Sequence, residues 1–126
     1  MFELDLRSNR YTRTSTVRGL FDGKPDQLAR ILTGGVGETH EDDLLYFTEE
    51  GGVDAGVHAR SADGRYFTIL ESPTYKTETS GLSFSPNGKI LYIAYQENGV
   101  LFEVKRKDGR AFHQKSLNVK YHATSQ

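Results

Sequence analysis

The chain of 126 residues contains no cysteine. Disulfide bonds and thiolate metal sites are therefore excluded within it. No apolar run approaches the roughly 18 residues of a transmembrane helix. The first 14 residues alternate in polarity and lack the apolar region of a signal peptide. Because the chain opens as though already inside a folded unit, we expect it to be a piece of a longer chain, or one whose leader has been removed.

An excess of charge is also missing, since 16 Lys and Arg residues face 17 Asp and Glu residues. A near-neutral chain has no global attraction for nucleic acid or for an anionic membrane, so neither is an expected partner. Hydrophobic residues make up only 36% of this single domain's worth of protein. Leaving out the 7 Tyr and adding the 13 Gly gives 51 of 126 residues, about 40%, which is below the ~45–50% of a typical globular domain. Either the core is small or part of the surface is covered by a partner.

Three segments share the pattern of an alternating strand, a polar turn and a second alternating strand. They are residues 1–14, 56–70 and 100–114. Their turns contain Arg7-Ser8-Asn9, Asp63-Gly64 and Asp108-Gly109. Asp-Gly between alternating apolar residues is a strong hairpin signal, because both residues tolerate a positive φ. The sequence therefore predicts three β-hairpins.

The pattern recurs at a regular distance. Asp63-Gly64 and Asp108-Gly109 lie 45 positions apart, and Leu45-Tyr46 and Leu91-Tyr92 lie 46 apart. A repeat of about 40–50 residues made of strands and turns is typical of β-propeller blades. An all-β sandwich would also have short, regularly spaced strands, but it would not explain the repeat. We predict an all-β chain of antiparallel four-stranded meanders of the β-propeller-blade type.

The expected organisation is a leading hairpin (1–20), two blade units (21–75 and 76–117) and a polar tail (118–126). This makes about two and a half blades, whereas closed propellers have about four to eight. An unclosed stack leaves edge strands and sheet faces exposed. The expected partners are therefore the remaining blades of a larger propeller, copies of this chain, or a larger assembly.

The second unit is expected to have strands at residues 82–85, 90–95, 100–105 and 111–117. Asn87-Gly88 would form the tight turn between the first two. Only residues 24–32 resist the strand pattern. Their apolar residues recur at helical spacing behind Pro25-Asp26, which predicts a short helix. A loop leading into a strand at 29–32 is the alternative.

The stretch TETSGLSFSPNGKILYIAYQ, residues 77–96, resembles a late-blade motif of PhoX-type alkaline phosphatases and their relatives. The motif reads roughly Glu-Thr-x-Gly-x-x-Phe-Ser-Pro-Asp/Asn-Gly-Lys-x-Leu-Tyr/Phe. Its matches here are Glu78, Thr79, Gly81, Phe84, Ser85, Pro86, Asn87, Gly88, Lys89, Leu91 and Tyr92. An earlier family element, a Pro-Asp loop followed by an acidic-Gly pair, is matched by Pro25, Asp26, Glu49, Glu50 and Gly51. The resemblance covers about residues 20–113.

The resemblance implies that the chain is the C-terminal part of a six-bladed, exported propeller that hydrolyses phosphomonoesters. In that family calcium and iron ions on the propeller axis are held by carboxylates from several blades. Hard cations prefer oxygen ligands, and clustered metals stabilise the charge on a transferring phosphoryl group. The resemblance makes Glu78, Glu50 and Glu49 the candidate metal ligands, and calcium and iron the implied cofactors.

Two departures limit what the resemblance implies. The family's iron centre uses a cysteine ligand, which this chain lacks, and the blades that carry further ligands are absent. We therefore expect that the chain alone is not a competent phosphatase of this type. The alternative function is a non-catalytic β-propeller module for binding or assembly.

Each candidate residue also has a structural interpretation. Glu78 stands between two threonines, which suits a solvated turn acid as well as a ligand. Glu49 and Glu50 are adjacent on a strand end and point to opposite faces, and Glu50 beside Gly51-Gly52 has more room.

His58, Asp54 and Arg60 form the second candidate group. His58 and Asp54 would form an acid–base pair, and Arg60 would bind phosphate. The alternative is a polar strand face, with His58 and Arg60 on one side and Val57 and Ala59 on the other.

Overall fold

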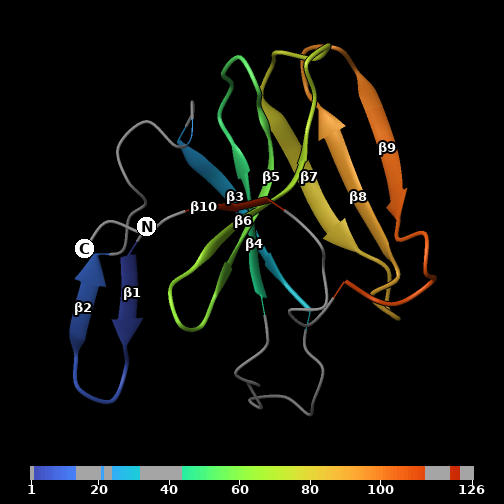
Figure 1. The fold of residues 1–126 in the computed structure, drawn as a ribbon. Helices are drawn as coiled ribbons and strands as arrows, with labels where there is room; N and C mark the ends of the chain where they lie inside the picture. The colour runs from blue at the N-terminus through green and yellow to red at the C-terminus, as the bar shows by residue number, and fades with distance from the viewer. Residues whose placement is uncertain (1, 14–20, 22–23, 32–43, 113–119, 123–126) are drawn as a thin grey trace.

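The computed structural model describes residues 2–13, 21, 24–31, 44–112 and 120–122. Every regular element in these ranges is a β-strand, and all pairing is antiparallel (Figure 1). The strands are β1 (Phe2–Asp5), β2 (Arg10–Arg13), β3 (Pro25–Arg30), β4 (Leu44–Glu49), β5 (Gly56–Ser61), β6 (Tyr66–Glu71), β7 (Thr79–Phe84), β8 (Ile90–Tyr95), β9 (Val100–Lys105) and β10 (Lys120–His122). The all-β prediction is confirmed.

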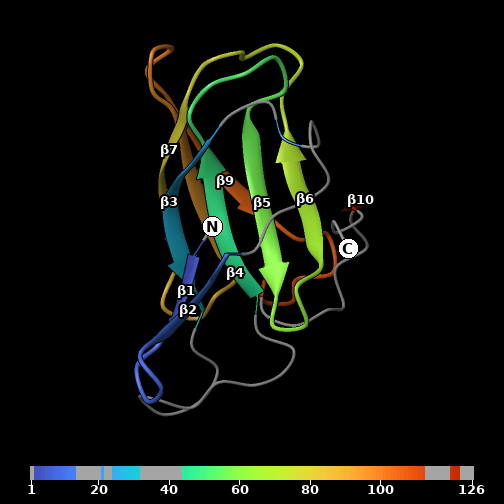
Figure 2. The ribbon, with the colours of Figure 1, turned by 90° about the vertical axis from the view of Figure 1, so that its left-hand side faces the viewer.

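The first blade unit forms a four-stranded meander in which chain neighbours are sheet neighbours. The order is β3-β4-β5-β6, and β10 from the predicted tail pairs with the free edge of β6. Figure 2 shows this sheet face on, with β4 and β5 in its middle. None of the sheets closes on itself within the described ranges.

The helix predicted behind Pro25 is wrong. Residues Pro25–Arg30 form β3, whose Leu28 and Ala29 pair with Phe47 and Tyr46 of β4. The amide of Gln27 also donates a hydrogen bond to the Thr48 hydroxyl (3.0 Å). Pairing along β4 outweighs the weak helical spacing, because local propensity yields to tertiary context. The alternative strand was the better interpretation, although the strand begins earlier than expected.

The second unit contributes the sheet β7-β8-β9. Asn87-Gly88 forms the expected tight turn, in which the Gly88 amide donates to the Ser85 carbonyl oxygen (2.8 Å). Gly88 has a φ of 65°, a conformation that glycine adopts without strain. The Asn87 side-chain oxygen accepts a hydrogen bond from the Lys89 amide (3.1 Å). The turn chemistry predicted from the sequence is thus present.

The fourth strand expected at 111–117 is wrong at its first two residues, and residues 113–117 lie outside the described ranges. Ala111 and Phe112 are not in a strand. The Phe112 amide donates instead to the Gly88 carbonyl oxygen (2.8 Å), and its own carbonyl accepts from the Tyr46 hydroxyl. Phe112 is therefore drawn between the two sheets rather than along β9.

The leading hairpin is confirmed as β1-β2. Asn9 in its turn has a φ of 51°, which asparagine tolerates better than most residues.

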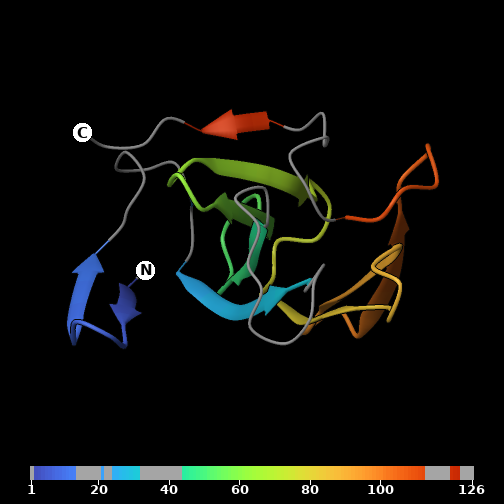
Figure 3. The same ribbon diagram turned by 90° about the horizontal axis from the view of Figure 1, so that it is seen from below.

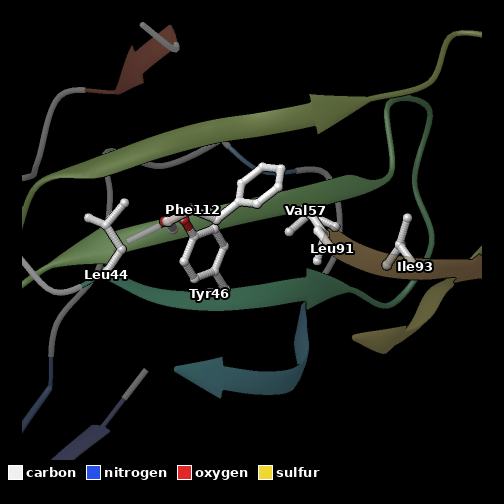
Figure 4. Close-up of a cluster of buried hydrophobic side chains, with 7 residues drawn as sticks. Leu44, Tyr46, Val57, Leu91, Ile93 and Phe112 are labelled. Atoms are coloured by element: carbon white, nitrogen blue, oxygen red, sulfur yellow. The ribbon is translucent and has the colours of Figure 1, made fainter. Parts of the chain in front are cut away.

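The core lies between the two larger sheets (Figure 4). Its buried members are Leu44, Tyr46, Val57, Ala59, Leu91, Ile93 and Phe112. The sheets approach each other most closely where β7 lies against β3 and β4. Seen from below in Figure 3, they spread apart from that side toward β6 and β9. Larger side chains such as Phe67 and Phe102 fill the widening space.

Candidate functional site

A buried hydrogen-bonded array crosses three neighbouring strands of the first sheet. Glu49 on β4 approaches the ring of His58 on β5, with 2.8 Å between Oε2 and Nε2. The other ring nitrogen, Nδ1, lies 3.1 Å from the hydroxyl oxygen of Thr68 on β6. Glu49 and His58 are 2% and 1% exposed. The three side chains share one face of the sheet. Glu49 lies two residues after Phe47 and so on the same face, Phe47 pairs with His58, and His58 pairs with Thr68.

Aromatic rings enclose this array. The ring centroid of Phe21 lies 4.5 Å from that of His58, and the ring centroid of Phe47 lies 5.5 Å from it. The ring centroid of Tyr66 lies 5.8 Å from that of Phe21 and 6.1 Å from that of Phe47. Buried apolar surroundings strengthen hydrogen bonds between polar groups and make an unpaired group costly. The array therefore rigidifies this face of the sheet.

Either charge state of His58 leaves its partners satisfied. A neutral ring donates from Nε2 to Glu49 and accepts the Thr68 hydroxyl at Nδ1. A protonated ring donates from both nitrogens, and the Thr68 hydroxyl then donates to Oε1 of Glu71, 3.5 Å away. A carboxylate, an imidazole and a hydroxyl in line are also the parts of a nucleophilic triad.

A pocket of about 430 Å³ lies elsewhere, where the ends of β3 and β7 meet, and is lined by Arg30, Ser83 and Phe84 among others. None of the array residues lines it. The array thus acts as a set of mutually satisfied buried polar groups.

The two adjacent glutamates point to opposite faces, as predicted. Glu49 is the buried one. Glu50 is exposed, and its carboxylate lies 4.0 Å from the Nζ of Lys24, which is also exposed. Exposed pairs of this kind contribute little to stability. The greater room expected at Glu50 is open to solvent, whereas the side chain of Glu49 is buried and bonded to His58.

His58 is paired with Glu49, and Asp54 is exposed in the loop between β4 and β5. The expected division of strand faces is confirmed, because Val57 and Ala59 lie in the core. Arg60 shares the opposite face with His58, and its guanidinium forms an ion pair with Glu3 of β1 (3.3 Å). Arg60 therefore connects the leading hairpin to the first sheet.

Glu78 is half-buried and directly precedes β7. Its carbonyl oxygen accepts a hydrogen bond from the Gln96 amide (3.0 Å). The next residue, Thr79, is fully buried and joins the two sheets. Its hydroxyl oxygen accepts from the Glu49 amide (3.1 Å), and its hydroxyl lies within donating distance of the Gly56 carbonyl oxygen (2.9 Å).

Thr79 thereby places Glu78 at the end of the sheets where Glu49 and Glu50 also lie. Within the described ranges, however, no group of three or more His, Asp or Glu side chains is arranged to hold a metal ion. The three glutamates are brought to the same end of the fold without forming one cluster.

The contact between Glu49 and His58 was missed by sequence reasoning, although a signal for it exists. Residues 44–47 are all apolar or aromatic, which indicates a strand buried on both faces. Glu49 follows Phe47 on the same face and must then find a buried partner. The register between β4 and β5, which supplies His58, comes only from the folded sheet.

Comparison with protein-family models, curated proteins and solved structures found no match. The described ranges also contain no helix that is long and apolar enough to cross a membrane.

Proposed function

We propose that this chain is a non-catalytic module of the β-propeller type, whose sheet faces serve assembly. The supporting observation is that side chains at equivalent positions of the two repeats point in the same direction, from the first sheet toward the second and beyond it. Tyr46 on β4 points from the first sheet toward the second. Its counterpart Tyr92, 46 positions later, points away from the first sheet, because its neighbours Leu91 and Ile93 occupy the core.

Two consecutive blades of a propeller have this relation, because rotation about the axis carries one blade onto the next. In a sandwich, by contrast, the two sheets face each other across one aligned core. The wedge between the sheets, narrow at β3 and β7 and wide at β6 and β9, favours the propeller arrangement. In this arrangement β3 and β7 are the inner strands.

The side chains that would be suited to chemistry are already engaged within the fold. Glu49, His58 and Thr68 are buried and bonded to one another, and Arg60 is paired with Glu3. Among the described residues, Asp54 lies in the exposed loop between β4 and β5 and takes no part in these bonds. The contact surfaces of the sheets are therefore a better basis for function than these groups.

A second candidate function is a calcium-associated part of a PhoX-like, phosphatase-like propeller. Thr79 favours it, because this residue brings Glu78 to the end of the fold that carries Glu49 and Glu50. Carboxylates of two repeats at one end are what an axial calcium site would use. Iron would need a ligand other than cysteine, which the chain lacks.

Thermal unfolding with and without millimolar calcium separates the two functions. The assembly module is expected to show no calcium-dependent shift and no metal-dependent hydrolysis of p-nitrophenyl phosphate. If the chain binds calcium, a free calcium concentration 100 times the dissociation constant would instead add about 2.7 kcal/mol to the free energy of unfolding. A shift that disappears in Glu78→Gln and Glu50→Gln, but not in the exposed control Glu97→Gln, would overturn the proposal in favour of the second candidate.

A further inference from the structure

The pocket between the ends of β3 and β7 has no part in the polar array. Its volume of about 430 Å³ lies in the range of pockets that bind small molecules. β3 and the residue after it contribute Ala29, Arg30 and Ile31, while β7 and the turn after it contribute Ser83, Phe84, Ser85 and Pro86. The pocket is thus built from the edge strands of two different sheets, which lie side by side in Figure 3.

The two strands are bonded to each other beside the pocket. The Leu82 amide of β7 donates a hydrogen bond to the side-chain oxygen of Gln27 on β3 (3.1 Å). The Gln27 amide is itself bonded to Thr48 of β4, so this bridge is fixed to the first sheet. Ile31 packs against the turn after β7, since a Cβ added at Gly88 would lie 3.2 Å from its Cγ2. The walls are therefore in place before a ligand binds, which lowers the entropic cost of binding.

A backbone amide of β7 is directed into the pocket. The Ser85 amide donates to the Ile90 carbonyl oxygen of β8 (2.9 Å). Successive residues of an antiparallel strand turn their amides to alternate edges, so the Phe84 amide is turned away from β8 and toward β3. Phe84 lines the pocket on the free edge of β7. Its N–H is therefore a hydrogen-bond donor for a ligand there.

Arg30 alone carries a charge among the described residues that line the pocket. It is exposed, and none of the ion pairs in the described part of the chain includes it. Ser83 is also exposed and adds a hydroxyl. A guanidinium, a backbone amide and a hydroxyl are all hydrogen-bond donors. The pocket therefore favours an anionic ligand with oxygen acceptors.

The chemical class of this anion follows from the charge and from the other lining residues. A carboxylate matches the single charge of Arg30 and accepts the two parallel hydrogen bonds of a guanidinium. A phosphate dianion would keep one charge unmatched among the described lining residues. An apolar body joined to the carboxylate would bury the apolar part of the lining, which consists of Ala29, Ile31, Phe84 and Pro86.

We propose that the pocket between β3 and β7 binds a small monocarboxylate with an apolar body, held by Arg30, the Phe84 amide and the Ser83 hydroxyl. This inference does not depend on the proposed assembly function. The guanidinium supplies the charge, and the strand edge and the hydroxyl orient the carboxylate. The apolar body lies against Phe84 and its apolar neighbours.

Calorimetric titration with phenylacetate tests the proposal on the wild type and on four variants. The wild type should bind phenylacetate saturably. Arg30→Ala should weaken binding about tenfold or more, because it removes hydrogen bonds from a charged group. Arg30→Lys should fall in between, since it keeps the charge but not the planar fork. Ser83→Ala should cost about threefold.

Arg7→Ala is the matched control, because Arg7 is an exposed arginine in the turn of the leading hairpin and does not line the pocket. It should bind like the wild type. Circular dichroism checks that each variant folds, and Arg30→Gln replaces Arg30→Ala if that variant does not. In the wild type, the amide resonance of Phe84 should shift as phenylacetate is added, which locates the ligand at the edge of β7.

Three further probes test the chemical class. Phenylacetamide lacks the charge, acetate lacks the apolar body, and inorganic phosphate carries a different anion. Each should bind about tenfold or more weakly than phenylacetate. Absence of phenylacetate binding, or equal binding by Arg30→Ala, would overturn the proposal. Equal binding of phenylacetamide or phosphate would also overturn it, because the ligand would then not be recognised as a carboxylate.

Discussion

The two larger sheets of this chain have the same repeat and very different surroundings. β4 and β5 of the first sheet are buried along almost their whole length. β8 alternates between buried and half-buried residues, and β9 between half-buried and exposed ones. The repeat fixes strands and turns in both sheets, whereas the burial of a face depends on what packs against it.

Equivalent positions consequently carry different chemistry. By register and spacing, Phe47 and His58 of the first sheet correspond to Ile93 and Phe102 of the second. In the second sheet these positions face the apolar side of the first and continue the core. In the first sheet they face Phe21, and a polar array with aromatic cover occupies the same place. A repeated strand position can thus hold either apolar core residues or a buried polar array, provided that every buried polar group has a partner.

The largest expected effect tests the difference in burial. Phe47→Ala removes a buried ring from the face of the first sheet that lies away from the second, and should lower the free energy of unfolding by about 3–5 kcal/mol. Tyr92→Ala, on the uncovered face of the second sheet, should cost about 1 kcal/mol or less. Urea unfolding at a concentration where the chain is monomeric measures both.

Ile93→Ala provides the internal control, because Ile93 is fully buried between the sheets and should cost about 2–5 kcal/mol. If Phe47→Ala proved as mild as Tyr92→Ala, the first sheet would not be covered on both faces. The contrast between the sheets would then be lost.

The second prediction concerns the polar array. Glu49→Ala removes the carboxylate that bonds Nε2 of His58 in a buried, aromatic environment, and should cost about 1–3 kcal/mol. Glu50→Ala is the matched control one residue away. It should stay within about 0.5 kcal/mol of the wild type, because Glu50 is exposed and its pair with Lys24 is long.

The same denaturation series measures both glutamate variants, and Glu49→Gln adds a test of the hydrogen bond itself. The glutamine side-chain oxygen still accepts from His58, so this variant should fall between the wild type and Glu49→Ala. Equal effects of Glu49→Ala and Glu50→Ala would show that the array does not stabilise the first sheet.

The sequence predicts local features of this fold well. The turns at Asn87-Gly88, Asp63-Gly64 and Asp108-Gly109 were found because their chemistry lies within a few residues. β3 was obscured because its strand conformation depends on pairing with β4, about 20 residues later in the chain. Local propensity has no access to such a partner.

The candidate site was predictable only in part, for the same reason. Adjacency alone places Glu49 and Glu50 on opposite faces, but which face is covered depends on Phe21 and on the neighbouring strands. The choice of Asp54 as the partner of His58 followed closeness in sequence. The sheet instead selects the acid that lies beside His58 across the β4-β5 register.

The smallest expected effect concerns the turn that follows β9, which is the second sheet's counterpart of the turn between β5 and β6. The Arg106 guanidinium donates to both carboxylate oxygens of Asp108 (2.9 and 2.5 Å), and the Arg110 amide donates to one of them (3.0 Å). The hydrogen bonds from Arg106, followed by the one from Arg110, lower the pKa of Asp108 from 3.8 to about 2. The turn is therefore held more tightly when Asp108 is ionised.

Because the pKa is lower in the folded state, the stabilisation is fully present above pH 4 and is lost as the pH falls toward 2. The difference in urea midpoint between the wild type and Asp108→Asn should be small and constant above pH 4, and should shrink on acidification below it. Salt should reduce the difference further, because the pair is exposed. A difference that grew on acidification would mean that the contacts of Asp108 do not favour its ionised form in the folded chain.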